Sequence, residues 1–187
     1  MFSLCSSRGR REVPEIPEFN SAGSLFTNGT HVLAAYQRDP KKPTVSGIGG
    51  KREGGEKYME TAIRETVEEV FGLAEVSPVL IGRIISKVEP RVVKQMGAYV
   101  LLIYNFNDLE KIIEIVRGEV RVSPLYKVFP RTLLELILKR EGAAEPRPEV
   151  FYLSLLPAVK NTTIDVEFLE DIKIVLDDDL MVRNPMN

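Results

Sequence analysis

The residues of this chain that could do chemistry are most concentrated between Gly49 and Leu73, where it reads GGKREGGEKYMETAIRETVEEVFGL. Glu65, Glu68 and Glu69 recur within this stretch at spacings of three and four residues. On a helix, such spacings place the three carboxylates within roughly 100° of arc, where like charges repel one another. Hard divalent cations such as Mg²⁺ bind carboxylate oxygens and keep water molecules for substrate phosphates. A bound metal ion is therefore the simplest explanation for the cluster.

A glycine-rich loop and the helix after it must position these carboxylates. The loop glycines are Gly47, Gly49, Gly50, Gly54 and Gly55. Apolar or small residues then follow the period of one helical face, at Met59, Ala62, Ile63, Thr66, Val67 and Val70. This period places the glutamates on the opposite face and predicts that the helix ends at a Gly72 C-cap. The alternative without a site is an ordinary surface helix with an acidic face after a flexible loop.

The spacing of this stretch resembles the signature of the Nudix hydrolases. Gly50 is followed after five residues by Glu56, and after seven more by the run Arg64–Glu69 (RETVEE). Thr66 stands where the family has an aliphatic residue, and Gly72 comes one residue later than the family's glycine. The match covers the 23 residues from Gly50 to Gly72. Beyond them, the resemblance is one of architecture.

This resemblance implies a metal-dependent pyrophosphohydrolase that cleaves a nucleoside diphosphate linked to another group, either a nucleotide or the 5′ cap of an mRNA. Mg²⁺ or Mn²⁺ would neutralise the pyrophosphate and lower the pKa of the attacking water. In the family, carboxylates of this helix hold the metal ions, which carries over to Glu65, Glu68 and Glu69. The backbone carbonyl of Gly50, or of its neighbour Gly49, is expected to join them.

The residue that activates the water has two possible locations by the same resemblance. If the base lies in the motif helix, Glu65 or Glu68 takes this role. If it lies in a later loop, the candidates are Glu89, Glu119 and Glu149. The sequence does not rank these alternatives.

Basic residues around the motif are expected to support the site or to bind the substrate. Arg64 and Glu56 are expected to form a pair that holds the loop against the helix, although Arg64 could also pair with Glu60 or Glu68 within the helix. Three further basic residues are candidates for binding phosphate: Lys51, Arg52 and Arg38.

The sequence gives less information about the substrate than about the motif. The chain has no Trp, and core packing is favoured for the other candidate partners of a nucleobase: Tyr36, Tyr58, Tyr104, Phe106, Tyr126 and Phe129. The order GG-KRE-GGE and the chain size also resemble the decapping Nudix proteins of large DNA viruses, which would make capped RNA the substrate. Their extra helical domain is not evident here. Two other hypotheses are a non-catalytic Nudix-fold module that binds a nucleotide or a protein, and an unrelated acidic-helix protein.

Composition indicates an ordinary globular enzyme. The 187 residues fit one domain, with 44% hydrophobic and 28% charged residues. A net charge of −2 gives no overall attraction for nucleic acid, so we expect no DNA partner. No apolar run approaches the roughly 18 residues of a membrane span, and the basic N-terminus has the wrong order for a secretory signal. We therefore expect a cytoplasmic or nuclear protein without an internal disulfide, because Cys5 is the single cysteine. The oligomeric state does not follow from the sequence.

The order of elements predicts an α/β fold, consistent with the Nudix-type α/β/α sandwich with a mixed sheet that the resemblance implies. We expect a flexible basic arm over 1–17, and a single domain over 18–187 with a possible helical elaboration at 108–142. The expected strands are Ser21–Phe26, His31–Arg38, Thr44–Ile48, Pro78–Val88, Gly97–Asn105 and Glu119–Tyr126. An Asn28-Gly29 hairpin is expected to join the first two of them. The expected helices after the motif are Asp108–Arg117, capped by Asp108 and Gly118, and Pro130–Lys139. Phe151–Leu156 and Val166–Leu176 fit either class, and Lys87–Lys94 is expected to be a hairpin connection.

Overall fold

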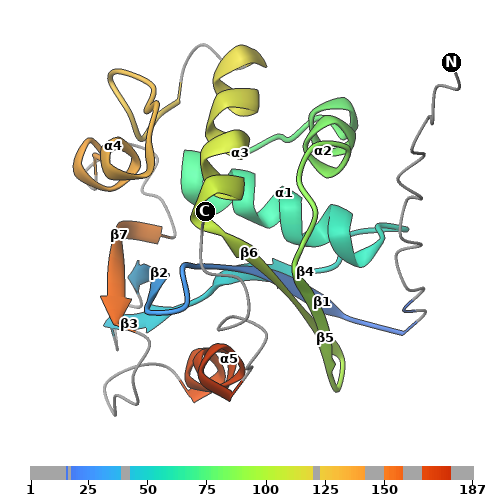
Figure 1. Cartoon of the computed structure of the whole chain (residues 1–187). Helices are drawn as coiled ribbons and strands as arrows, with labels where there is room; N and C mark the ends of the chain where they lie inside the picture. The colour runs from blue at the N-terminus through green and yellow to red at the C-terminus, as the bar shows by residue number, and fades with distance from the viewer. Residues whose placement is uncertain are drawn as a thin grey trace, which may run out of the picture.

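Two layers of helices cover a mixed β-sheet in the computed structural model of this protein (Figure 1). The structure describes residues 16, 18–38, 43–119, 123–141, 150–157 and 166–177. The strands are β1 (Ser21–Thr27), β2 (His31–Arg38), β3 (Pro43–Ser46), β4 (Ile48–Lys51), β5 (Val92–Met96), β6 (Tyr99–Asn105) and β7 (Val150–Pro157). The helices are α1 (Tyr58–Phe71), α2 (Pro78–Ile85), α3 (Phe106–Glu119), α4 (Leu133–Leu138) and α5 (Val166–Asp177). The prediction of a single α/β domain with a mixed sheet is confirmed.

Strand β1 lies at the centre of the seven-stranded sheet, and its residues after Ser21 are buried. The strand order is β3-β2-β1-β6-β5, with β4 also paired to β1 and β7 to β2. β1 runs parallel to β6 and antiparallel to β4. In the β1–β4 ladder, Gly23 faces Gly49 and Ala22 faces Gly50. This pairing places the two motif glycines on the sheet just before the chain enters α1.

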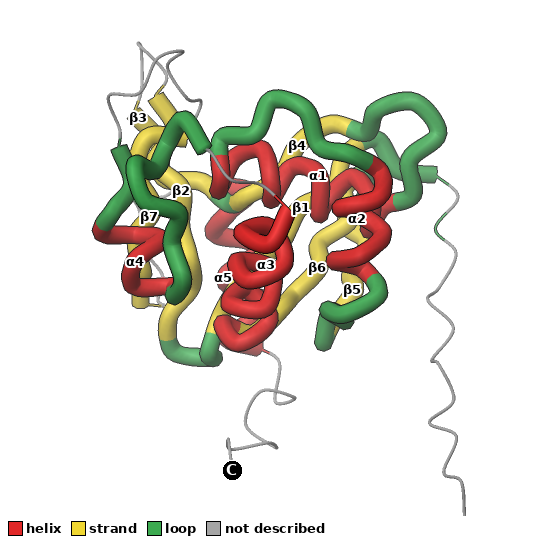
Figure 2. Tube along the Cα trace, turned by 90° about the horizontal axis from the view of Figure 1, so that it is seen from above, coloured by secondary structure: helices red, strands yellow, loops and turns green. Residues whose placement is uncertain are grey.

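The two faces of the sheet bury separate apolar cores. The larger core lies under α1, α2, α3 and α4, which all cover one face (Figures 1 and 2). Tyr104 belongs to this core and is stacked on Phe26 at 5.5 Å between ring centroids. The smaller core lies under α5 on the opposite face, where Phe168, Ile172 and Val175 pack against residues of β1, β2 and β6. The helix α1 is thus separated from α5 by the thickness of the sheet.

Helix α1 ends where its pattern predicts. It begins after Lys57, whose backbone N–H donates to the Glu60 carboxylate at 2.7 Å. Its C-cap is Gly72, with φ 68°, a left-handed conformation that glycine adopts without a Cβ penalty. A Cβ at Gly72 would also lie 2.5 Å from Leu125 Cγ, so both conformation and space require glycine there.

The prediction of a strand over Pro78–Val88 is wrong. This segment forms helix α2, in which Pro78 occupies the first turn and the Ser77 hydroxyl accepts a hydrogen bond from the Leu80 N–H at 3.1 Å. Its buried residues Leu80, Ile81 and Ile84 have helical spacing. A short apolar run fits both a strand and a helix, and the Ser-Pro cap decides for the helix.

The next hairpin lies later in the chain than we predicted. The residues expected to form a connection, Lys87–Lys94, instead lead into β5, which pairs with β6 from Val92↔Ile103 to Met96↔Tyr99. The turn is at Gly97, with φ 60°. A left-handed glycine between two short β-rich runs favours a tight turn, which moves the hairpin here.

The glycine-rich segment before α1 is also more regular than we predicted. The single strand expected at Thr44–Ile48 is replaced by β3 and β4, which meet at Gly47. Gly49 and Gly50 therefore lie in a strand and not in a loop. Cross-strand hydrogen bonding to β1 has overridden the low strand propensity of glycine.

Three predicted helix and strand limits also differ. Asn105, not Asp108, caps α3: its side chain accepts from the Asp108 N–H at 2.7 Å, and Gly118 lies inside the helix. α4 begins after Thr132, whose hydroxyl accepts from the Glu135 N–H at 3.2 Å, so Pro130 precedes the helix. Of the strand expected at Glu119–Tyr126, residues 120–122 are outside the described part, and the described residues carry a single bridge, Ser123↔Tyr126.

The two undecided segments are now assigned. Phe151–Leu156 lies within β7, because it pairs with β2 in antiparallel register. Val166–Leu176 lies within α5. The basic arm expected over 1–17 lies outside the described residues except for Ile16.

Candidate functional site

The side chain of Arg64 joins strand β4, the following loop and helix α1 at one point. Its Nε donates to Glu56 at 2.8 Å, and its Nη1 donates to both Glu65 and Glu68 at 2.9 Å. Its Nη2 donates to the backbone carbonyl of Lys51 at the end of β4, at 2.7 Å. Arg64 is only 6% exposed. Burial would lower its pKa, but the three carboxylates outweigh burial and raise it above the usual range.

The expected ion pair between Arg64 and Glu56 is present, and Glu56 accepts further hydrogen bonds. The Glu53 N–H donates to it at 3.1 Å and the Thr61 hydroxyl at 2.9 Å. Burial raises the pKa of Glu56, but these donors and Arg64 more than compensate, so its pKa lies below the usual value. Glu56 thus connects the loop to the first turn of α1 as an ionised carboxylate.

Glu68 has the opposite electrostatic balance. Burial raises its pKa, and the Arg64 contact offsets this only in part, while nearby Glu53 and Glu56 add to the rise. Its side chain remains 28% exposed. An added cation stabilises a partly exposed carboxylate with a raised pKa more than it stabilises a carboxylate whose charge is already compensated, such as that of Glu56.

Gly50 and Gly49 bring the β4 backbone against two glutamates of α1. A Cβ built at Gly50 would overlap the Glu65 carboxylate. The Gly49 N–H donates to Glu69 at 3.0 Å, and a Cβ at Gly49 would lie 2.6 Å from Gly23 Cα. Close approach therefore explains these glycines, since neither has a positive φ.

The motif glutamates do not lie on a solvated helix face, which argues against the alternative of an ordinary acidic surface helix. Glu69 is 9% exposed, and the Glu65 side chain is 14% exposed. The acidic face of α1 packs against β4 because Gly49 and Gly50 leave room for it. Like-charge repulsion between Glu65 and Glu68 is relieved by Arg64 itself.

The donor chemistry of this cluster suits a hard divalent cation. Glu65, Glu68 and Glu69 offer only oxygen ligands, as does the β4 backbone, and Mg²⁺ and Mn²⁺ prefer such ligands. As placed, the carboxylates contact Arg64 and Gly49 instead of converging on a point. Accordingly, no group of three or more His, Cys, Asp or Glu side chains within the described residues is arranged to hold a metal ion.

The other candidate bases lie elsewhere or outside the described residues. Glu119, at the end of α3, forms an ion pair with Arg83 of α2 at 2.5 Å. Glu89 is exposed between α2 and β5. Glu149 is outside the described residues. A base in the motif helix and a base in a later loop therefore both stay open.

The candidate phosphate-binding residues are in different environments. Lys51 is exposed at the end of β4, beside the Arg64 cluster. The Arg52 guanidinium lies 4.5 Å from the centre of the Phe19 ring, a cation–π contact that uses it in packing. The side chain of Arg38 is outside the described residues, as are Lys41 and Lys42.

Both departures of the sequence from the family motif are accommodated. The Thr66 hydroxyl is buried and contacts the Ser24 hydroxyl at 2.9 Å and the Ala62 carbonyl at 2.7 Å. Ser24 of β1 thus supplies the polar partner that a threonine needs at this core position. The late glycine, Gly72, forms the C-cap described above.

Arg140 is a residue of this region that the sequence did not reveal. It is 7% exposed and donates to the carbonyls of Glu69 and Val70, each at 2.6 Å. It also donates to the Val150 carbonyl at 2.7 Å and to the Tyr126 hydroxyl at 3.1 Å. Burial lowers the pKa of Arg140, and the Tyr126 hydroxyl and the charge of Glu69 offset this only in part. The cation caps the last turn of α1 from outside the helix, where the macrodipole favours positive charge.

Solved structures similar to this chain are Nudix hydrolases. A bifunctional NMN adenylyltransferase/ADP-ribose pyrophosphatase from Francisella tularensis, complexed with AMP and a Mn ion, is 15% identical with a TM-score of 0.49, and the alignment covers 88% of this chain and 43% of that one. A Nudix-family hydrolase from Clostridium perfringens is 14% identical (TM-score 0.38; 87% and 98% covered), and a MutT/nudix protein from Listeria innocua is 15% identical (TM-score 0.37; 87% and 94%).

These similarities span most of this chain, but the chain spans less than half of the Francisella protein. At these identities and TM-scores they assign neither an activity nor a site to it. No family model matches the sequence. No curated protein matches it either. Within the part of the chain that the structure describes, no helix has both the length and the apolar composition needed to cross a membrane.

Proposed function

We propose that this protein is a metal-dependent pyrophosphohydrolase that cleaves a nucleoside diphosphate linked to another moiety, either a nucleotide or an RNA 5′ cap. The observation that carries this proposal is the Arg64 cluster. One buried guanidinium holds Glu56, Glu65 and Glu68 beside the glycines of β4. An ordinary acidic surface helix would not bury its arginine at 6% exposure or place its glutamates against a glycine strand.

In this proposal, Glu65, Glu68 and Glu69 are the carboxylates that hold Mg²⁺ or Mn²⁺, together with the backbone carbonyl of Gly50 or Gly49. The metal supplies positive charge that neutralises the pyrophosphate and acidifies a water molecule. Glu65 or Glu68 accepts the proton from the attacking water, because both carboxylates lie at the β4 edge of the helix.

The remaining residues position this machinery. Arg64 orients Glu65 and Glu68, so it is a positioning residue that does not itself touch substrate. Glu56 holds the loop in register with α1 through its hydrogen bonds to Arg64 and Thr61. Lys51, exposed at the end of the same strand, is suited to bind a substrate phosphate.

The test is a substrate panel with Mg²⁺ or Mn²⁺: capped RNA, nucleoside triphosphates, ADP-ribose, NAD and dinucleoside polyphosphates, with the products identified. We expect cleavage of a phosphoanhydride bond in at least one member. Glu68→Gln and Glu69→Gln should each lower turnover by about 100-fold or more. A folded wild-type protein that cleaves no member would refute the proposal and favour a nucleotide- or protein-binding module.

A further inference from the structure

The last four backbone carbonyls of helix α1 all accept hydrogen bonds. Such carbonyls have no partner within their own helix. The first of the four is satisfied locally, by the N–H of the C-cap. The donors to the other three come from residues after α3: Arg140 donates to the Glu69 and Val70 carbonyls, and the Ser123 hydroxyl donates to the Phe71 carbonyl. Side chains far along the chain therefore hold the end of the motif helix in place.

Glu69 is held through both its backbone and its side chain. Its carbonyl accepts from Arg140 Nη2 at 2.6 Å, and its carboxylate accepts from the Gly49 N–H of β4 at 3.0 Å. The Cα–Cβ bond of a helical residue has a fixed direction relative to the backbone. A displacement of the last turn of α1 would therefore carry the Glu69 carboxylate away from β4.

Arg140 can fix this turn because all three of its guanidinium nitrogens donate to neighbours in the fold. Besides its contacts with α1, Nη1 donates to the Tyr126 hydroxyl at 3.1 Å and Nη2 donates to the Val150 carbonyl of β7 at 2.7 Å. Nε donates to the Phe151 carbonyl of the same strand at 3.2 Å. A guanidinium presents its donors in a rigid planar fork. These contacts therefore fix the end of α1 relative to β7.

We propose that Arg140 is a positioning residue of the hydrolytic centre, which holds the last turn of α1 so that the Glu69 carboxylate keeps its place against β4. The proposal rests on the proposed function only for the role of Glu69 as a cation ligand. Mg²⁺ demands near-ideal ligand geometry. Loss of a group that orients a metal ligand typically weakens metal affinity 10–100-fold. In this role Arg140 touches neither the cation nor the substrate.

Positioning and direct electrostatics predict opposite effects of removing Arg140. If its charge alone acted on the bound cation, Arg140→Met would remove a repulsion between positive charges and tighten Mn²⁺ binding. If Arg140 positions Glu69, the same substitution should weaken binding although a positive charge is lost. Arg140→Lys keeps the charge, but a single ammonium group does not reproduce the fork that spans α1 and β7.

Two measurements on the full chain test the proposal. In the metal-free protein, the amide proton chemical shift of Gly49 reports its hydrogen bond to the Glu69 carboxylate, and it should change in Arg140→Met and in Arg140→Lys. Mn²⁺ titration without substrate, followed by the electron paramagnetic resonance signal of the free ion, gives the Kd. We expect a Kd about tenfold or more higher in Arg140→Met and a smaller increase in Arg140→Lys.

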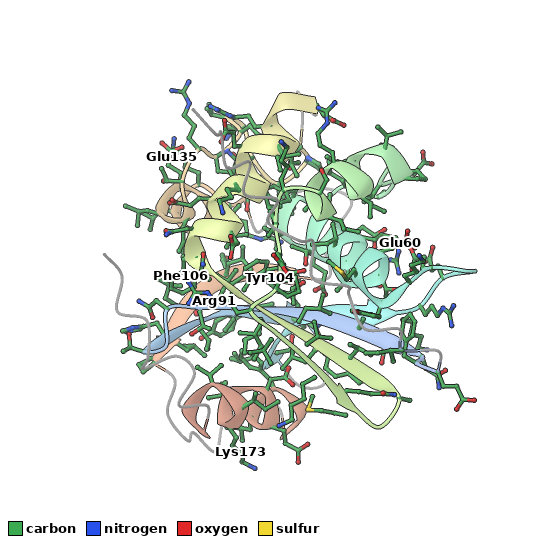
Figure 3. All side chains as sticks on the ribbon, turned by 45° about the vertical axis from the view of Figure 1, so that its right-hand side comes forward. Glu60, Arg91, Tyr104, Phe106, Glu135 and Lys173 are labelled. Carbon is green, nitrogen blue, oxygen red and sulfur yellow. The ribbon has the colours of Figure 1, made fainter. Side chains whose placement is uncertain are left out.

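Ile172→Ala is the control for a general loss of stability. Ile172 is buried in the smaller core under α5, so its truncation destabilises the fold. Figure 3 shows Glu60 of α1 and Glu135 of α4 on one side of the sheet and Lys173 of α5 on the other. The control should therefore leave the Gly49 signal and the Kd for Mn²⁺ close to their wild-type values.

The proposal would be overturned if Arg140→Met matched Ile172→Ala in both measurements, or if it bound Mn²⁺ more tightly than wild type. If Arg140→Met does not fold, the same two measurements on Arg140→Lys decide. The proposed function fails separately. A wild type that binds no Mn²⁺ would reject Glu69 as a cation ligand, and the Gly49 signal would still show whether Arg140 positions it. Mn²⁺ binding that depends on Arg140, without turnover of any substrate, would reject hydrolysis alone.

Discussion

Arg64 contacts Glu56 and Glu68 at nearly equal distances, yet the pKa values of the two carboxylates move in opposite directions. Glu56 has three kinds of donor, whereas Glu68 shares its Arg64 nitrogen with Glu65. The difference separates a structural carboxylate from one whose charge is poorly compensated.

The two carboxylates should therefore affect stability with opposite pH dependence. A lowered pKa means that ionised Glu56 stabilises the fold above its unfolded pKa. This stabilisation is lost as pH falls through the pKa of Glu56 in the folded protein. A raised pKa means that Glu68 contributes most to the stability of the fold below its unfolded pKa. This contribution is lost as pH rises through the pKa of Glu68 in the folded protein. In metal-free buffer at about pH 7, Glu56→Gln should reduce the free energy of unfolding by about 1 kcal/mol or more, and Glu68→Gln should not reduce it.

Urea denaturation at a series of pH values measures this directly. The difference between wild type and Glu56→Gln should shrink as pH falls through the lowered pKa of Glu56. If Glu68→Gln were the more destabilising of the two at neutral pH, the electrostatic picture of the cluster would be wrong.

The contact between Gly50 and Glu65 gives a second prediction at the scale of single residues. In Gly50→Ala, the added methyl group would overlap the Glu65 carboxylate and displace it, at a cost of about 1–3 kcal/mol. Gly55→Ala is the matched control, because no atom lies within 4 Å of a Cβ there and its φ is not positive. Thermal melts and turnover of the two variants test this. A Gly50→Ala protein as stable and active as Gly55→Ala would mean that the close approach has no consequence.

At the scale of elements, helix α1 is held at both ends by residues from other parts of the chain. Its first turn is tied to the preceding loop by Glu56 and Thr61. Its last turn is capped by Arg140, from just after α4, which also holds the Val150 carbonyl of β7. The motif helix therefore depends on the later half of the chain for its position.

Removing this cap should destabilise the protein far more than removing a surface charge beside it. Arg140→Met removes the hydrogen bonds from Arg140 to the Glu69, Val70 and Val150 carbonyls, and we expect a loss of about 3 kcal/mol or more in urea denaturation. Tyr126→Phe removes one partner and should cost about 1 kcal/mol. The neighbouring Lys139→Gln breaks a surface pair with Glu135 and should cost less than about 1 kcal/mol. Comparable losses in Arg140→Met and Lys139→Gln would contradict this role.

At the scale of the whole molecule, the net charge of −2 leaves RNA binding to local cations. Exposed cations among the described residues include Lys51 at the end of β4, Arg91 just before β5 and Lys94 in β5. Arg52, which lies over Phe19, is a weaker candidate. A capped RNA would need such residues for phosphates beyond the cap, whereas a small nucleotide would not.

Salt dependence of binding separates these substrates. Each single-strand phosphate neutralised adds roughly 0.7 to the slope of log affinity against log salt. If capped RNA is the substrate, a long capped RNA should give a steeper slope than a cap dinucleotide. Combined Arg91→Glu and Lys94→Glu substitutions should then weaken the RNA and spare the dinucleotide. Equal slopes would exclude the RNA and leave a hydrolase of small nucleotides.

The sequence by itself determined the features that depend on local spacing. The period of the motif helix predicted α1 and its Gly72 cap, and Asn28-Gly29 predicted the turn between β1 and β2. The expected pairing of Arg64 with Glu56 within the same stretch is also present.

Only the tertiary structure decided which of these residues are buried and what they contact. Gly49 and Gly50 became a strand because β1 offered a ladder, and Glu69 was buried because those glycines left room for it. Arg140 caps a helix that lies 70 residues earlier in the chain, and no local pattern encodes such a contact. Short-range periodicity selects elements, whereas hydrogen bonding and burial between distant segments decide the partners of polar groups.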